Sequence, residues 1–415
     1  MSNLFWPGSE RRGDQFTEAI FLQSMLAVEA AWLKALVEVG IAPEAARHGL
    51  LDVVTEDDLV MIATEAESSG NPVVPLVGLL RERLRGPSPA AAAWLHRGLT
   101  SQDVVDSAIM LMLRETSYRI RYETRVQITT LIEMVEQHRD VPMVARTLTQ
   151  HAVPQTFGLK AAQWLRGILD VVDRPSTNAF PVQIGGAAGT LAAVTELAAG
   201  SGAEDPAQLA LEAAARAAAV LGLNWVPPWH TSRDAVTRLG GSAVRFTDAW
   251  GRIANDVLVM SRPEVGEVTE GRPGGSSTMP HKRNPVLASL IRRAAVVAPG
   301  LGASLHVGSM DSVDERAGGA WQAEWGVLAD LERSVVVAAS QTTELLAGLQ
   351  IHEDRLAANL AASLPDILAE QRVMADLVGR PVATDPRDYL GASHLLVDEI
   401  LGRAHHYLEL YGADE

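Results

Sequence analysis

The sequence predicts an all-α protein built around a bundle of long helices. Apolar residues recur at steps of three and four, which places Met25, Val28, Trp32 and Leu36 on one face of a helix. The stretch 99–141 contains no glycine and no proline, and could form a helix of about 60 Å. Alternating strand patterns are scarce. Because helices of that length are stabilised mainly by their neighbours, the chain is expected to fold as a long-helix bundle.

Other helices follow in order along the chain. Gly40 ends the first of them, and 206–221 is rich in alanine, a small residue that allows helices to pack closely. The patterns indicate a small N-terminal helical domain over 1–102, a central bundle over 103–347 and a small C-terminal helical domain over 348–415. After the long stretch, helices are predicted at 157–170, 206–221, 242–260, 285–297 and 321–349.

Composition restricts the class of protein. The chain has 415 residues, of which 47% are apolar, as in globular proteins. Its 35 basic and 51 acidic residues give a net charge of −16, which argues against nucleic acid as a partner. The absence of cysteine excludes disulfides, thiolate metal sites and cysteine nucleophiles, and fits a reducing compartment.

Targeting and membrane signals are not evident. The N-terminus has no basic stretch followed by an apolar one, so no export signal is predicted. The longest charge-free stretch, 175–195, is interrupted by proline and glycine and carries polar side chains that a bilayer would penalise. We therefore expect a cytoplasmic protein without a membrane partner.

Two short motifs are set aside. Gly185 to Gly189 superficially resembles a dinucleotide loop, but it lacks the required spacing and follows no convincing strand, so a turn between helices is favoured. His405 and His406 have no nearby carboxylate cluster and are expected to be solvated. No metal site and no cofactor are predicted.

The most informative segment runs from Gly274 to Pro285. Two glycines before two serines predict a movable loop that can bring backbone N–H groups close to a ligand. Asn284 and Pro285 then have the form of a helix N-cap and first residue. A helix start beside Lys282 predicts an anion site. The alternative is a capped loop with a solvated basic pair, and the density of special residues favours the functional interpretation.

Two further segments concentrate polar residues. Thr100 and Asp103 have the form of a capping box for the long helix, and capping alone could explain both. The same helix start would also present Ser101 and Gln102 to an anion. The third segment, 146–158, lies just ahead of another predicted helix, and its polar groups imply either an internal network or a ligand.

Taken together, the three segments resemble the aspartase/fumarase superfamily. The family's loop G-S-S-x-M-P-x-K-x-N is matched without departure by 275–284. Within the superfamily, 100–106, 150–160 and 229–234 are similar to 3-carboxy-cis,cis-muconate cycloisomerase, and so are 321–325 and 385–391. Each of these stretches is a weaker mark than the serine loop. The similarity runs over most of the chain.

The resemblance implies a homotetramer with a twenty-helix core, sites shared between three subunits, and no metal or organic cofactor. It also implies a cycloisomerase that interconverts 3-carboxy-cis,cis-muconate, a small polycarboxylate, and 4-carboxymuconolactone, as in the protocatechuate branch of the beta-ketoadipate pathway. Ser276 would be the catalytic base, and we assign His151 as the second catalytic group. The predicted substrate contacts are His96, Thr100, Ser101, Gln102, Arg146, Thr147, Gln150, Arg233, Lys282 and Asn284.

The chemistry of proton removal agrees with these roles. Loss of a proton alpha to a carboxylate gives a doubly charged aci-carboxylate, which needs preorganised positive groups such as Lys282 and the amide of Asn284. A serine hydroxyl is a poor base at its ordinary acidity. Ser276 would therefore need the same positive surroundings and a closed loop that excludes water.

One departure from the superfamily bears on the leaving group. Adenylosuccinate and argininosuccinate lyases carry Thr-His where this chain has Thr147 and Leu148. Leucine cannot protonate an amine, whereas a carboxylate, whose conjugate acid has a pKa near ~4, leaves unaided. Leu148 thus favours lactone chemistry. A lyase that releases fumarate by eliminating another stable anion, or an amine, remains the alternative. In a competing interpretation Leu148 is only a packing residue and another group, such as His151, serves as the acid. A silent helical scaffold is disfavoured by the intact serine loop.

Overall fold

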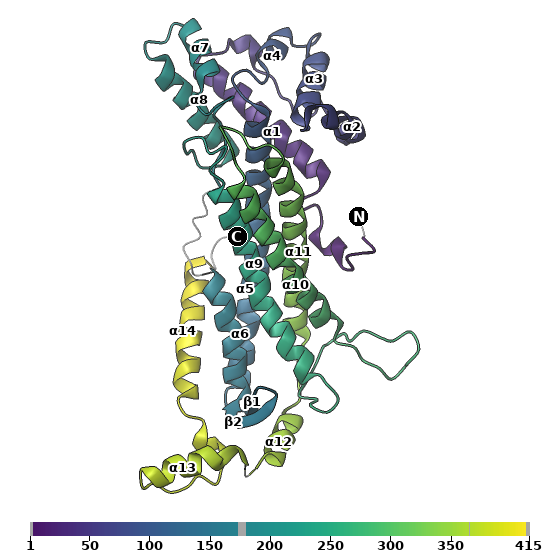
Figure 1. Ribbon diagram of the computed structural model, residues 1–415, viewed down its shortest axis with the longest axis vertical. Coiled ribbons are helices and arrows are strands. Elements are labelled where there is room, and N and C mark those ends of the chain that lie inside the picture. Colours follow the sequence, from purple (N-terminus) through teal and green to yellow (C-terminus); the bar gives the residue numbers. More distant parts are fainter. Residues whose placement is uncertain (1–2, 173–179, 365, 412–415) are drawn as a thin grey trace.

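The computed structural model describes residues 3–172, 180–364 and 366–411, and within these ranges most residues are helical. Five long helices form the centre of the molecule (Figure 1). Helix α9 packs against α10 and α6, α10 against α11, and α5 against both α11 and α6, which closes the bundle. The five are α5 (Ser101–Gln137), α6 (Phe157–Val172), α9 (Asp234–Met260), α10 (Val286–Met310) and α11 (Ala320–Gly348). The predicted fold class is confirmed.

Further helices cover the end of the bundle where α5 begins (Figure 1). They include α1, whose buried face carries the predicted Met25, Val28, Trp32 and Leu36. After α6 the chain returns to this end, where α8 packs on α1 through buried alanines. The helices at this end are α1 (Glu18–Glu38), α2 (Leu59–Ser69), α3 (Val73–Leu84), α4 (Pro89–Trp94), α7 (Ala192–Gly200) and α8 (Pro206–Leu221), with 3₁₀ turns η2 (Glu44–Ala46) and η3 (Glu56–Asp58). The 3₁₀ turn η1 (Ser9–Arg12) packs instead along α11.

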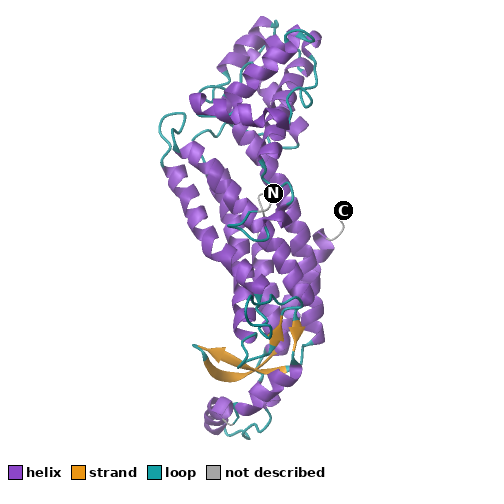
Figure 2. Ribbon diagram, turned by 90° about the vertical axis from the view of Figure 1, so that its right-hand side faces the viewer, coloured by secondary structure: helices purple, strands orange, loops and turns teal. Residues whose placement is uncertain are grey.

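The C-terminal segment lies at the opposite end, and its last helix turns back along the bundle (Figure 2). Helix α14 packs on α6 and α5, while α12 packs on the first strand of a hairpin. The elements are α12 (Glu353–Ala362), η4 (Asp366–Leu368), α13 (Ala369–Leu377), η5 (Pro386–Tyr389) and α14 (Ser393–Tyr411).

An antiparallel hairpin follows α5 and was not predicted. Strands β1 (Pro142–Thr147) and β2 (Gln150–Thr156) are joined by Leu148 and Thr149, whose φ values are 47° and 69°. Two successive left-handed residues are typical of a type I′ turn, which normally takes Asn-Gly. The turn was missed because these residues give no such signal. Two-residue strands β3 (Val268–Thr269) and β4 (Gln350–Ile351) pair beside it.

Among the described residues, two helices are long and apolar enough to cross a membrane by length and composition alone, and they differ in burial. In α1, 61% of the apolar window is buried, as in the core helix of a globular protein. In α10 only 28% is buried, and Val296, Val307 and Met310 are 70%, 62% and 77% exposed. Helix α10 therefore presents apolar side chains that no part of the described chain covers.

Candidate active site

The serine loop, residues 274–284, projects from the bundle between β3 and α10 (Figure 1). Its neck is closed by two backbone hydrogen bonds, because Gly274 and Asn284 each donate an N–H to the other's carbonyl at 2.8 Å. The Asn284 amide Nδ2 also donates to the Gly275 carbonyl at 2.9 Å. In this conformation Asn284 stabilises the loop itself, which differs from its predicted role as a substrate contact.

Ser276 has a polarised environment within that loop. Its Oγ accepts from the backbone N–H of Met279 at 3.2 Å and, more weakly, from that of Thr278 at 3.4 Å. Hydrogen bonds to an oxygen favour its negatively charged form. Two amides aimed at one hydroxyl oxygen therefore favour an alkoxide, the form in which Ser276 could act as a base.

The start of α10 is not the open anion site that the sequence predicted. The buried carboxylate of Glu270 accepts from the N–H groups of Leu287 and Ala288 at 3.1 and 2.8 Å. Burial raises the pKa of Glu270, and these helix N–H donors oppose that shift. Since the protein's own carboxylate occupies the helix N-terminus, a substrate anion has to rely on exposed side chains such as Lys282.

At the other end of the molecule, the predicted capping box of α5 is present. The Asp103 carboxylate accepts from the Thr100 N–H at 2.9 Å. The same buried carboxylate accepts from the N–H groups of Gly185 and Gly186 at 3.0 and 2.9 Å, and His230 Nε2 lies 3.0 Å from it. The glycine segment is therefore a turn that docks on α5, as its sequence favoured over a dinucleotide loop.

Three predicted contacts surround this helix start. Gln102 is fully buried, and its Nε2 donates to the His230 carbonyl at 2.8 Å while its Oε1 has no partner. His96 Nδ1 lies 2.5 Å from a carboxylate oxygen of the buried Glu29. Ser101, the first residue of α5, is half-buried. Ser101, together with the neighbouring Thr100, offers the side chains that a ligand could reach most directly.

Arg316 is a cation at this place that sequence reasoning missed. It lies in the loop between α10 and α11, and its Nη2 donates to Thr100 Oγ1 at 2.5 Å and to the Ala187 carbonyl at 3.4 Å. The guanidinium is exposed beside the helix start, where it adds positive charge. The only signal in the sequence was a basic residue in a loop between two predicted helices, which is too common to identify a site.

Arg233 was predicted to bind substrate, and in the structure its guanidinium is paired within the subunit. The guanidinium is buried and donates to Asp106 at 2.7 and 3.1 Å and to Glu324 at 2.6 to 3.2 Å. Burial would lower the pKa of Arg233, but the two carboxylates raise it. Its remaining N–H faces the His230 carbonyl at 3.4 Å. Because every donor is used, Arg233 is a structural cation that ties α5, α9 and α11 together.

The hairpin holds the remaining predicted residues. Arg146 makes a bidentate ion pair with the fully buried Glu267, at 2.9 and 2.6 Å, so it too is occupied within the subunit. Thr147 and Gln150 are exposed beside the turn. His151 is exposed as well, apart from a contact of 2.7 Å between its Nδ1 and Ser363 Oγ. Thr147, Gln150 and His151 thus remain accessible.

The segments do not meet within one subunit. Helix α5 has 37 residues, so its two ends are about 55 Å apart. Thr100 precedes this helix and the hairpin follows it, and the two lie at opposite ends of the molecule (Figures 1 and 2). The structure therefore brings the hairpin and the stem of the serine loop to one end, and leaves Thr100 and Ser101 at the other.

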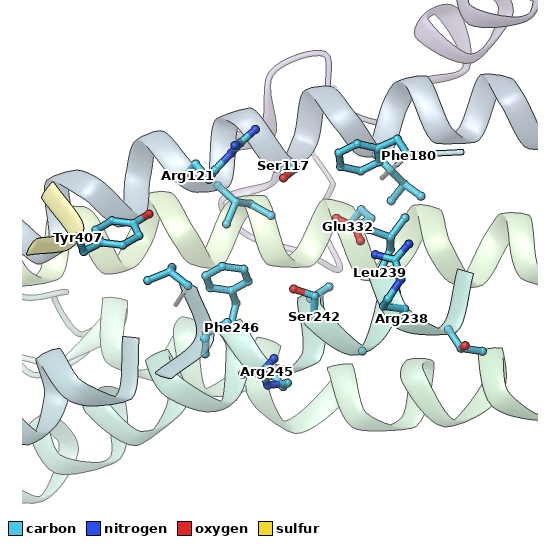
Figure 3. A pocket seen from close by; sticks show the side chains of 17 residues that line it. Ser117, Arg121, Phe180, Arg238, Leu239, Ser242, Arg245, Phe246, Glu332 and Tyr407 are labelled. Carbon is cyan, nitrogen blue, oxygen red and sulfur yellow. The ribbon is translucent and has the colours of Figure 1, made fainter. Parts of the chain in front are cut away.

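A separate cavity of about 420 Å³ lies within the bundle, lined by parts of α5, α9 and α11. Figure 3 shows Ser117, Phe246 and Glu332 around it, and none of the predicted site residues lines it. Burial raises the pKa of Glu332 to about 8. A neutral carboxyl group in the bundle is thus a structural consequence of the fold rather than part of the predicted site.

We expect the Glu332→Gln variant to become more stable relative to wild type as the pH rises. Glu332 keeps its proton in the folded state up to about pH 8, whereas the unfolded chain loses it near the ordinary pKa of 4.5. Between these two pKa values, each rise of one pH unit therefore lowers the free energy of unfolding of the wild type by about 1.4 kcal/mol. The difference in Tm between variant and wild type, measured by thermal unfolding, should be larger at pH 8 than at pH 5. An equal difference in Tm at the two pH values would contradict the raised pKa of Glu332.

Comparison with known proteins places this geometry in a family. A family model described as lyase matches residues 9–300. The chain is 41% identical to nitrosuccinate lyase of Streptomyces davaonensis over 88% of this chain and 78% of that protein. It is 36% identical to 3-carboxy-cis,cis-muconate cycloisomerase of Bradyrhizobium diazoefficiens over 84% and 76% of the two chains.

A solved structure agrees with these matches. The 3-carboxy-cis,cis-muconate lactonizing enzyme of Pseudomonas putida superimposes with a TM-score of 0.84 at 28% identity, covering 96% of this chain and 97% of that one. A long-helix bundle, an intact serine loop and relatives of this similarity all agree. The chain belongs to the lyase family, within the fumarase/aspartase superfamily.

Proposed function

We propose that the protein is a lyase that removes a stable anion from a succinate substrate to give fumarate, with nitrosuccinate as the specific candidate. The observation that carries this proposal is the 41% identity to nitrosuccinate lyase. Leu148 at the hairpin tip, where amine-eliminating relatives have a histidine, supports a leaving group that departs without a proton. Nitrosuccinate is named for the relative at 41% identity. This reaction takes the place of the cycloisomerisation that the sequence favoured, and corresponds to the alternative stated there.

The elimination has two halves. Ser276, as an alkoxide polarised by the amides of Thr278 and Met279, takes a proton from the carbon next to the carboxylate. The resulting aci-carboxylate is stabilised by the positive charge of Lys282. The C–N bond then breaks, its electron pair leaves with nitrite, and a double bond forms between the two carbons.

The hairpin supplies the reason for an anionic leaving group. Leu148 is 96% exposed and contributes to no core within the subunit. It also has a left-handed backbone, which costs a residue with a side chain about 1–2 kcal/mol. Strain at an exposed turn indicates a functional constraint. A leucine presented there excludes water without offering a proton, and nitrite, the anion of a weak acid, departs without one.

Cycloisomerisation of 3-carboxy-cis,cis-muconate is the second candidate. In that reaction the leaving group, seen in reverse, is the substrate's own carboxylate, which also needs no proton. It is supported by the close structural likeness to the lactonizing enzyme of Pseudomonas putida. Leu148 is compatible with both reactions, so substrate turnover has to separate them.

The decisive experiment offers the purified protein nitrosuccinate, 3-carboxy-cis,cis-muconate, adenylosuccinate and argininosuccinate in parallel. We expect fumarate and nitrite to appear in equal amounts from nitrosuccinate. Loss of diene absorbance from the muconate, with no reaction of nitrosuccinate, would select the second candidate. Robust release of an amine from either of the other two substrates would defeat the argument from Leu148.

We also propose a homotetramer whose active sites are shared between subunits. Two observations support it: the apolar face of α10 that nothing in the described chain covers, and the distance of about 55 Å between the two ends of α5. An apolar face of this kind is suited to burial in an interface. Sites at which Thr100, the hairpin and the serine loop meet then require several copies.

Mixing two inactive variants is expected to restore activity. Ser276→Ala and His151→Ala subunits, co-expressed so that they assemble together, would place an intact Ser276 and an intact His151 in about a quarter of the sites if different subunits supply them. Turnover of the mixture should approach that fraction of wild type, whereas each variant alone should be nearly inactive. A mixture with no more activity than its components would place both groups in one subunit.

A further inference from the structure

A closed chain of hydrogen bonds ties the base of the hairpin to α12. Arg146 and His151 are directly opposite each other on β1 and β2. Arg146 binds the Glu267 carboxylate, which also accepts from Asn359 Nδ2 of α12 at 2.8 Å. At the end of the same helix, Ser363 Oγ contacts His151 Nδ1 at 2.7 Å. The helix therefore holds both strands of the hairpin.

The direction of these bonds follows from the chemistry of Ser363. Its hydroxyl lies 2.8 Å from the Asn359 carbonyl oxygen, which can only accept, so the single hydroxyl hydrogen is donated there. The Ser363 N–H bonds the Leu360 carbonyl and does not compete for that oxygen. Ser363 Oγ must then accept from His151, and the donor is the hydrogen on Nδ1.

We propose that Ser363 is a positioning residue that fixes His151 in the tautomer with its hydrogen on Nδ1. The neutral ring then has a free lone pair on Nε2. Ser363 is itself buried, whereas the His151 ring is otherwise exposed, so the fixed end of the ring is the end at α12. The tautomer is set by the bond that the other nitrogen makes.

The consequence for turnover rests on the proposed function, in which His151 of one subunit meets the serine loop of another. Ser276 has to lose its hydroxyl proton before it can remove one from the substrate. In the tautomer set by Ser363, Nε2 of His151 can accept that proton, giving an imidazolium and an alkoxide. The alkoxide then takes the substrate's proton, and the imidazolium releases its own to solvent when the cycle ends. With the other tautomer, Nε2 carries hydrogen and cannot accept.

The test combines NMR with kinetics on the full-length protein. Spectra of isotope-labelled histidine, with the His151 signal assigned by its loss in His151→Gln, report which ring nitrogen carries hydrogen, and require no substrate. Wild type is expected to show the hydrogen on Nδ1. In Ser363→Ala the population should move toward the Nε2 form, and kcat should fall about tenfold at unchanged KM, in proportion to the loss of one hydrogen bond.

Two further variants separate positioning from folding. Ser363→Thr keeps the hydroxyl and should restore both the tautomer and kcat. Ser393→Ala removes another buried serine of the C-terminal segment, whose hydroxyl donates to the Leu390 carbonyl and not to the hairpin, and should alter neither. Hydrogen on Nε2 in wild type, or an unchanged tautomer in Ser363→Ala, would overturn the proposal. Because the NMR result needs no turnover, failure of nitrosuccinate as a substrate would count against the proposed function alone.

Discussion

The Ser276→Ala variant is expected to lose at least about a hundredfold in turnover while keeping its helix content and assembly. The side chain lies in a projecting loop and contributes to no core, so its removal should not unfold the protein. What disappears is the oxygen toward which the amides of Thr278 and Met279 point. The measurement is kcat on the substrate identified above, with circular dichroism and sedimentation as checks on the fold.

Ser277 provides the matched control for that variant. It is the next residue of the same loop and is exposed, and the described contacts include no amide hydrogen bond to its hydroxyl. Ser277→Ala should therefore change turnover much less than Ser276→Ala does. Near-normal turnover in Ser276→Ala, or an equal loss in both variants, would remove Ser276 as the base.

The Arg233→Met variant is expected to be destabilised by about 3–5 kcal/mol, the usual consequence of removing one partner from a buried charge cluster. Asp106 and Glu324 would be left facing each other without the guanidinium that separates them. Trp229, whose ring lies 4.9 Å from that group, would lose its cation–π contact as well. Chemical denaturation, read as the free energy of unfolding or as a shift of the denaturation midpoint, measures the effect.

The control for this experiment is an arginine within α9 whose own side chain is exposed. Arg252 pairs with Asp256 at 2.7 Å and is 64% exposed, so Arg252→Met should cost no more than about 1 kcal/mol. If Arg233 bound substrate instead, Arg233→Met would fold as stably as wild type and show a raised KM. That outcome would restore the role expected from the sequence.

Local features were predictable from the sequence where a residue acts on its near neighbours. The apolar period of α1, the length of α5 and the capping box at Thr100 depend on residues three to seven positions apart, and all three are present. The hairpin was missed because Leu148 and Thr149 adopt a turn that their side chains disfavour, which only the surroundings can impose.

Interactions over long sequence distances were beyond that reasoning. Arg233 binds Asp106 and Glu324, which are 127 and 91 positions away in the sequence. The local motif alone therefore could not distinguish a substrate contact from a structural cation. Glu270 likewise reaches the start of α10 across the whole serine loop. Both are cases in which the folded chain supplies the partner that a ligand was expected to supply.

The carboxylate of Glu270 at the start of α10 also shapes how a substrate arrives. Because Glu270 occupies the N-terminus of α10, the dipole of this helix does not attract a substrate dianion. The serine loop then attracts the dianion through exposed side chains such as Lys282 and Arg283. These two cations sit on a molecule of net charge −16, whose far field repels the substrate. At low ionic strength that repulsion should slow the encounter, and moderate salt should relieve it before it screens the contact itself. The association rate would then pass through a maximum as salt increases.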